Sequence, residues 1–280
     1  MLNQASAYLL VSHGSRDPRP QIEVERLLGY LSEQLQAKYA SRQTECMGLP
    51  AGDRHPPFPV LAPAAGLQGS TTLPMLGSAT LELAEQPLHQ QIQQFAQRFV
   101  SHLRENEVPL LNASVEVVPL FLLQGVHVME DIPAEVAIAQ RALAEQVKVN
   151  VRAHLGSYPG LKRLLHAIVD ELPATHKILL AHGSRRPGSS EAIESLAADV
   201  GAIPAYWAVS PSVDSQVASL VSTGCQQITV LPYFLFSGGI TDAIAQLMEQ
   251  LSQTFPHIQL QLAQPLGASP ALAKVITDNI

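Results

Sequence analysis

The chain of 280 residues has 46% hydrophobic and 15% charged side chains, which is enough apolar material for packed cores and excludes a disordered chain. At about 100–200 residues per domain, this length predicts two domains or one large one. The net charge of −7 argues against a general binder of nucleic acids or anionic membranes, and two cysteines exclude an iron–sulfur cluster, a thiolate zinc site or a disulfide framework. No apolar run approaches about 20 residues and no secretory signal opens the chain, so we expect a cytoplasmic protein.

In the first half of the chain, short apolar runs alternate with amphipathic segments. A buried strand is predicted over residues 8–12 and a helix over 22–38, where apolar residues recur at helical spacing. The following elements are predicted by the same patterns: a strand over 80–84, a helix over 88–103, a strand over 115–123 and one long helix over 133–154, with Pro133 in its first turn.

Residues 42–79 interrupt this pattern with six prolines and five glycines. Prolines remove backbone donors and oppose regular structure, so we expect an irregular surface insertion here. An inert excursion is the favoured interpretation, and a lid over a binding site is the alternative.

The second half repeats the alternation. Its predicted elements are a helix over 161–172, strands over 177–181, 203–209, 227–235 and 258–262, and helices over 189–200, 212–222 and 241–254. Strands that alternate with helices predict an α/β fold with parallel sheets and helices on both faces. Such sheets bind ligands beyond the carboxyl ends of their strands.

Two blocks of sequence recur in the same order. LLVSHGSRDP at residues 9–18 returns as ILLAHGSRRP at 178–187, and VVPLFLLQG at 117–125 returns as VLPYFLFSG at 230–238. Two ordered matches are hard to produce by chance, so they predict an internal duplication.

The duplication predicts three segments. We expect an N-terminal lobe over residues 1–156, a connecting helix over 157–172 and a C-terminal lobe over 173–280. Each lobe carries one His-Gly-Ser-Arg motif at a strand end just before a helix. Glycine permits a sharp turn there, and arginine offers a fork for carboxylates.

The two halves differ in their chemistry. On the repeat, His127 aligns with Ile240, and an alignment on Pro87 and Pro211 sets Glu82 opposite Tyr206. The first half therefore carries His13, Glu82 and His127 at three strand ends, whereas the second keeps only His182. Two imidazoles and a carboxylate can bind a divalent cation or accept protons. A lone histidine is more often structural, but these three are predicted to share one sheet edge.

The sequence resembles the class II tetrapyrrole chelatases, and most of all the two-lobed sirohydrochlorin chelatases, which include ferrochelatases and cobaltochelatases. The resemblance is carried by residues 9–18, 81–87 and 117–133, and in a degenerate form by 178–187 and 230–238. It implies two tandem flavodoxin-like lobes with parallel sheets and an active cleft between them. Residues 42–79 depart from the compact family pattern.

The resemblance also implies the roles of individual residues. His13 and His127 carry over as catalytic and metal-binding residues, with Glu82 as their acidic partner. The tetrapyrrole is a polycarboxylate, and its predicted contacts are Ser15, Arg16, Arg19, Gly125 and Val126. The alternative for the arginines is a solvated surface.

The implied activity is metal insertion into sirohydrochlorin by a lyase. Fe²⁺ insertion to give siroheme is favoured, because this sequence lacks the histidine-rich tract and the cysteine cluster of some longer cobalt-associated relatives. Co²⁺ insertion for cobalamin biosynthesis is the alternative. A tetrapyrrole or metal carrier without turnover remains open, whereas a nucleotide binder lacks its glycine motifs. We expect no permanently bound cofactor, no nucleic-acid or membrane partner, and a monomer or homodimer.

Overall fold

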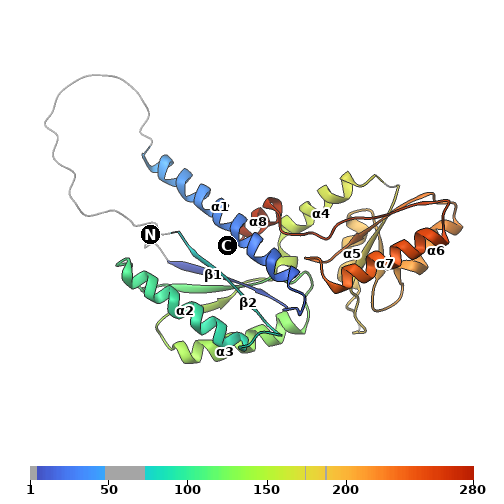
Figure 1. Ribbon diagram of the computed structural model, residues 1–280. Helices are drawn as coiled ribbons and strands as arrows, with labels where there is room; N and C mark the ends of the chain where they lie inside the picture. The colour runs from blue at the N-terminus through green and yellow to red at the C-terminus, as the bar shows by residue number, and fades with distance from the viewer. Residues whose placement is uncertain (1–4, 48–72, 174, 187) are drawn as a thin grey trace, which may run out of the picture.

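A computed structural model describes residues 5–47, 73–173, 175–186 and 188–280. It contains two four-stranded, all-parallel sheets with the strand orders β2-β1-β3-β4 and β6-β5-β7-β8 (Figure 1). The strands of the first sheet are β1 Ser6–Ser12, β2 Met75–Thr80, β3 Ser114–Pro119 and β4 Lys148–Val151. Those of the second are β5 His176–Ala181, β6 Ile203–Tyr206, β7 Gln227–Pro232 and β8 Gln259–Leu262. The shared strand order confirms the predicted duplicated α/β fold.

Helices follow most of the strands. Their bounds are α1 Arg19–Met47, α2 Leu88–Glu105, the π-helix η1 His127–Asp131, α3 Ile132–Leu143, the short 3₁₀ helix η2 Leu155–Ser157, α4 Pro159–Glu171, α5 Glu191–Asp199, α6 Val213–Ser222, α7 Gly239–Thr254 and α8 Pro270–Thr277. Within the ranges that the structure describes, no helix is both long and apolar enough to span a bilayer.

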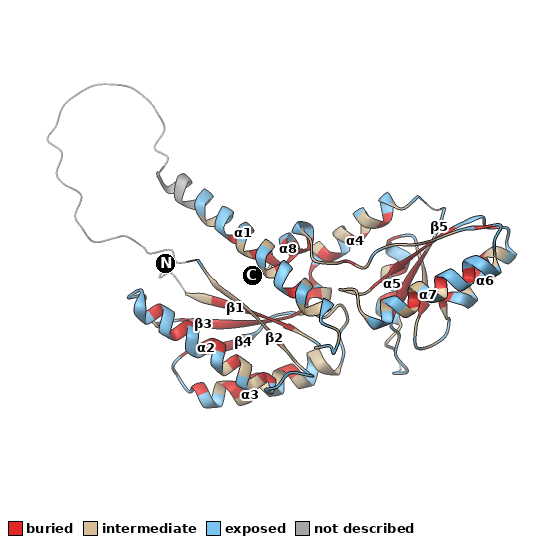
Figure 2. Cartoon of the chain, in the orientation of Figure 1, coloured by how far each residue is buried: buried red, intermediate tan, exposed pale blue. Residues whose placement is uncertain are grey.

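Both faces of the central strands are buried, which explains their continuous apolar sequence (Figure 2). In β1, Leu9 and Val11 join the cluster that α2 and α3 cover, whereas Leu10 joins a cluster on the opposite face. The second sheet packs against α6 and α7 in the same way. The cluster that contains Leu10 also includes Leu179 of β5, so one apolar core is shared by the two lobes.

The last helix ties the lobes together. Although α8 follows β8 of the second sheet, it packs against α1 of the first lobe. The Gln34 amide donates to the Pro270 carbonyl at 2.7 Å, and the Lys38 ammonium donates to the Thr277 carbonyl at 3.0 Å. The exact lobe boundaries stay a prediction. The last helix of the chain nevertheless packs on a helix of the first lobe.

One predicted element is wrong. The single helix over residues 133–154 is two elements, because α3 ends at Leu143 and β4 begins at Lys148. Ala144 has a positive φ of 49°, which ends the helix. Beyond it, buried Val147 and Val149 alternate with exposed neighbours, as the period of two of a strand requires.

The structure also corrects the region around the predicted insertion. The strand predicted over 80–84 lies at Met75–Thr80, and α1 continues to Met47, so regular structure enters both ends of the stretch 42–79. A Cβ on Gly77 would lie 2.5 Å from the Phe95 ring, so this glycine permits close packing of β2 against α2. The middle of the predicted insertion, residues 48–72, lies outside the described residues.

Candidate metal centre

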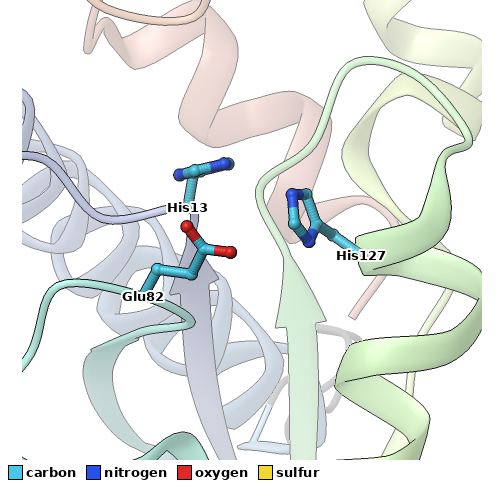
Figure 3. A group of neighbouring side chains, drawn as sticks. All are labelled: His13, Glu82 and His127. Carbon is cyan, nitrogen blue, oxygen red and sulfur yellow. The ribbon is translucent and has the colours of Figure 1, made fainter.

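The structure brings the three predicted ligands together. His13, Glu82 and His127 each offer a ligand atom, and these atoms all lie within 4.8 Å of one another (Figure 3). His13 and Glu82 are exposed and His127 is half-buried, so the group is open to solvent. Two imidazoles and a carboxylate suit a divalent transition metal and leave further coordination positions open.

Glycine allows the loops of His13 and Glu82 to meet. Gly14 has a φ of +100°, and a Cβ at this position would lie only 2.0 Å from the Glu82 carbonyl oxygen. Two backbone hydrogen bonds continue the sheet into these loops: the Leu81 amide donates to the Ser12 carbonyl, and the Glu82 amide donates to the His13 carbonyl, both at 2.9 Å. The sequence His13-Gly14 therefore places both side chains at one edge of the sheet.

His127 reaches the same place from a helix. It begins η1, eight residues after β3 ends, and lies one turn before Asp131. Its Nδ1 lies 2.7 Å from the Asp131 carboxylate oxygen. An Nδ1–H that donates to this carboxylate leaves the Nε2 lone pair for a metal, as in carboxylate–histidine–metal arrangements. A π-helical turn is rare and is often found at functional sites.

An aromatic ring flanks the two imidazoles. The ring centroids of His13 and His127 are 4.8 Å apart at an interplanar angle of 89°, and the Phe121 ring lies 6.3 Å from the first and 6.0 Å from the second. Phe121 and Asp131 are the residues of this site that the sequence patterns do not single out. The signal for Asp131 is its spacing of four residues from His127, which places both on one helix face.

The residues predicted to contact the tetrapyrrole differ in how many hydrogen bonds they already make within the protein. Among the described residues, no ion pair or hydrogen bond is found for the Arg16 side chain, and Gly125 is exposed with open space around it. Ser15 Oγ accepts a hydrogen bond from the Asp17 amide at 3.0 Å. The Gly125 carbonyl accepts from the amides of Val128 and Met129, so Gly125 and Val126 form the turn that leads into η1.

Arg19 is already paired. Its guanidinium donates to the carboxylates of Asp17 and Asp242. These hydrogen bonds lower the pKa of both carboxyl groups, and they raise the pKa of Arg19. A substrate carboxylate that binds Arg19 must displace one of the two aspartates.

The second lobe repeats the backbone geometry without the ligands. Gly183 has a φ of +80°, and the Ala208 amide donates to the His182 carbonyl at 2.8 Å, as Glu82 does to His13. Ala208 is therefore the counterpart of Glu82, and the predicted pairing of Glu82 with Tyr206 is wrong. The loop from β2 to Pro87 is two residues longer than the loop from β6 to Pro211, so an alignment on the prolines shifts the register.

The asymmetry that the repeat predicts is nevertheless present. Ile240 is the counterpart of His127, so His182 has neither a second histidine nor a carboxylate in the equivalent positions. Within the described ranges, the group around His13 is the one cluster of three or more such side chains that could hold a metal.

A family model matches most of the chain. The model of the CbiX family aligns with residues 60–172 and again with 177–280. This chain belongs to the CbiX family. The model matches twice, as a duplicated chain requires, although the first match starts after β1 and α1, and the matches confirm the resemblance to the class II chelatases.

Two curated relatives come from Priestia megaterium. The sirohydrochlorin ferrochelatase is 26% identical over 183 residues, and the sirohydrochlorin cobaltochelatase is 25% identical over 180 residues. Each match covers 59% of this CbiX-family chain, and they span 66% and 59% of the lengths of these relatives.

Solved structures share the two-lobed fold. The chain is similar to SirB from Bacillus subtilis with Fe³⁺, with a TM-score of 0.64 at 18% identity, over 99% of this chain and 94% of the other. The cobalt complex of SirB from Bacillus subtilis subspecies spizizenii gives the same values. The CbiX structure described as the terminal enzyme of siroheme biosynthesis in denitrifying bacteria gives 0.56 at 20% identity, over 98% and 99%. These matches confirm the predicted fold.

Proposed function

We propose that this CbiX-family protein is a sirohydrochlorin chelatase that inserts a divalent metal, with Fe²⁺ as the favoured ion, into sirohydrochlorin. The observation that carries the proposal is the cluster of His13, Glu82 and His127, which among the described residues is found on the first lobe alone. The names of the curated relatives supply the substrate class.

The chemistry of insertion fits these side chains. A divalent ion that enters the macrocycle replaces two pyrrole protons, so the reaction requires a transient metal ligand and a proton acceptor. Imidazole does both near neutrality, because its ordinary pKa is about 6.5. Two imidazoles and one carboxylate hold an ion less completely than four protein ligands would, so the ion can leave for the macrocycle.

Each residue has a distinct proposed role. His13 and His127 bind the ion, and their lone pairs accept the two displaced protons once the ion has left them for the macrocycle. Glu82 neutralises part of the charge of the ion. The hydrogen bond from Nδ1 of His127 to Asp131 fixes the ring and leaves Nε2 for this chemistry. The ion is a substrate here, so we propose no permanently bound cofactor.

The carboxylates of the macrocycle need cationic or donor partners on a protein of net charge −7. Arg16 is the guanidinium best placed for this role, since it follows the His13 loop and no partner holds it among the described residues. Ser15 lies in the same loop, and Gly125 and Val126 lie in the turn that leads to His127. Arg19 stays a predicted contact whose two carboxylate partners compete with the substrate.

Cobalt insertion is the second candidate. One curated relative is named a cobaltochelatase, and imidazole and carboxylate suit both ions. A carrier without turnover would use the same residues. The cytoplasmic location and the monomer or homodimer state stay predictions.

A turnover assay separates these candidates. Purified protein is mixed anaerobically with sirohydrochlorin and Fe²⁺ or Co²⁺, and the absorption change on metal insertion is followed for wild type, His13→Ala, His127→Ala and His182→Ala. We expect wild type and His182→Ala to turn over and the first two variants to lose nearly all activity. Binding of both substrates without any turnover in wild type would leave the carrier and reject the enzyme.

A further inference from the structure

Arg19 joins the two lobes at the end of the loop that begins with His13. It lies six residues after His13, and its Nε donates to both carboxylate oxygens of Asp17, at 3.1 and 3.0 Å. Its Nη1 and Nη2 donate to the two carboxylate oxygens of Asp242 in the second lobe, at 2.9 and 2.5 Å. Paired contacts of this kind between a guanidinium and a carboxylate are geometrically specific.

The carboxylate from the first lobe is fixed to the His13 loop. Asp17 Oδ1 accepts a hydrogen bond from the Arg19 amide at 3.0 Å, and the Asp17 amide donates to Ser15 Oγ at 3.0 Å. The loop from His13 to Arg19 is thus held by its own side chains, and its position depends on where Arg19 is held.

The carboxylate from the second lobe is fixed to α7. Asp242 lies in the first turn of this helix, where the helix dipole favours a negative charge, and its amide donates to the Gly238 carbonyl at 3.0 Å. A Cβ on Gly238 would lie 3.7 Å from Pro20 and 3.8 Å from the Asp17 carboxylate. The N-terminus of α7 therefore lies directly against the His13 loop.

The junction beside this contact holds a cavity whose lining mixes charged side chains with the apolar Ile22 and Pro265. A cavity of about 380 Å³ separates the start of α1 from the second lobe, with Arg19, Glu23 and Arg26 on one side and Ser237, Gln264 and Gly267 on the other. Across it, Glu23 accepts a hydrogen bond from the Ala268 amide at 2.9 Å. The apolar core that the lobes share fixes their overall packing, whereas at this junction the contacts of Arg19 and Glu23 hold the start of α1 to the second lobe.

We propose that Asp242 is a positioning residue. It holds Arg19, and Arg19 holds Asp17, so that the second lobe sets the position of the His13 loop that meets the macrocycle. The kinetic part of this inference rests on the proposed chelatase function. Asp242 belongs to neither the metal cluster nor the predicted substrate contacts. Its loss should change macrocycle binding and leave metal binding intact, because backbone hydrogen bonds to Leu81 and Glu82 hold the His13 end of the loop. The lobe that has lost the ligand set thereby keeps a part in the reaction.

The test compares Asp242→Ala with Asp214→Ala in the full chain. Both substitutions remove a carboxylate from the first turn of a second-lobe helix, but among the described residues Asp214 has no ion pair. We expect Asp242→Ala to raise KM for sirohydrochlorin about two- to fivefold, the effect of one exposed ion pair, with Co²⁺ affinity unchanged. Hydrogen exchange of the Asp17 and Arg19 amides should accelerate. Asp214→Ala should match wild type in all three measurements.

The conservative variant Asp242→Glu gives the second arm. It keeps a carboxylate for Arg19 in the first turn of α7, so it should recover the slow exchange and the lower KM. An unchanged KM and exchange rate in Asp242→Ala, a lower KM, which is expected if Asp242 only competes with the substrate for Arg19, or no recovery in Asp242→Glu would overturn the inference. If wild type shows no turnover, the proposed function fails, and the exchange rates alone then decide whether Asp242 holds the loop.

Discussion

At the scale of single residues, Asp131 determines which nitrogen of His127 is available to a metal. Its carboxylate accepts from Nδ1 at 2.7 Å, and it is the one partner found for the imidazole nitrogens of His127 among the described residues. Loss of a hydrogen-bond partner of this kind typically lowers metal affinity by about 10–100-fold.

We therefore predict that Asp131→Ala lowers Co²⁺ affinity by about tenfold or more. The Co²⁺ affinity of Asp131→Asn, which can still accept the hydrogen bond, should lie between those of Asp131→Ala and wild type. Thermal stability should change little, because the side chain is only half-buried. The control is Glu130→Gln, which alters the adjacent exposed carboxylate. Equal affinities for Asp131→Ala and wild type in calorimetry would show that Asp131 does not orient the ligand.

The sequence could predict His13, Glu82 and His127 because strand ends of a parallel sheet share one edge. It could not predict Asp131, since the spacing of His127 and Asp131 has meaning only if a helix begins at His127. The predicted helix began at Pro133, and the π-helical turn before it has no sequence signature that these patterns use. Phe121 read as a strand residue, yet β3 ends at Pro119.

At the scale of elements, the loops after β1 and β2 are coupled by Gly14. The overlap of an added Cβ with the Glu82 backbone cannot be relieved by a side-chain rotation, and the φ of +100° disfavours any L side chain.

Gly14→Ala should accordingly destabilise the protein by about 1–3 kcal/mol or more and weaken Co²⁺ binding, because the two loops must separate. Gly29→Ala, within α1 and with open space around it, should keep or slightly raise the stability. Chemical denaturation of both variants measures this. A Gly14→Ala protein as stable as wild type would mean that the loops rearrange without cost.

Two element boundaries are predicted wrongly because a residue does not have its usual role in the backbone. The end of α3 is marked by Ala144 in a positive-φ conformation rather than by glycine, so no helix-stop signal precedes β4. Conversely, Gly77 reads as a loop residue but serves close packing against Phe95 within β2. A residue type predicts the end of a helix or the position of a loop only where its own backbone preference determines the conformation.

At the scale of the whole molecule, both lobes share one apolar core, which predicts that they unfold together. Leu272 of α8 is fully buried in the cluster that also contains Leu10 of β1 and Leu179 of β5. The sequence patterns identify no helix after residue 262. Even a recognised apolar face on α8 would not reveal that it packs on the first lobe.

For this reason Leu272→Ala should cost about 2–5 kcal/mol and lower the unfolding temperature of the whole chain in a single transition. Lys274→Ala, on the exposed face of the same helix, should cost within about 0.5 kcal/mol. Calorimetric scans of both variants decide the matter. Two separate transitions, with only one shifted by Leu272→Ala, would show that the lobes unfold independently.

The central claim is that one asymmetric metal site stands on the first lobe, and calorimetric titration with Co²⁺ tests it most directly. Wild type and His182→Ala should each bind one equivalent at about pH 7.5, with weaker binding below about pH 6.5, where protons compete for imidazole nitrogens. The double variant His13→Ala/His127→Ala should bind none. A double variant that binds one equivalent as tightly as wild type, or a His182→Ala protein that loses the ion, would contradict the claim.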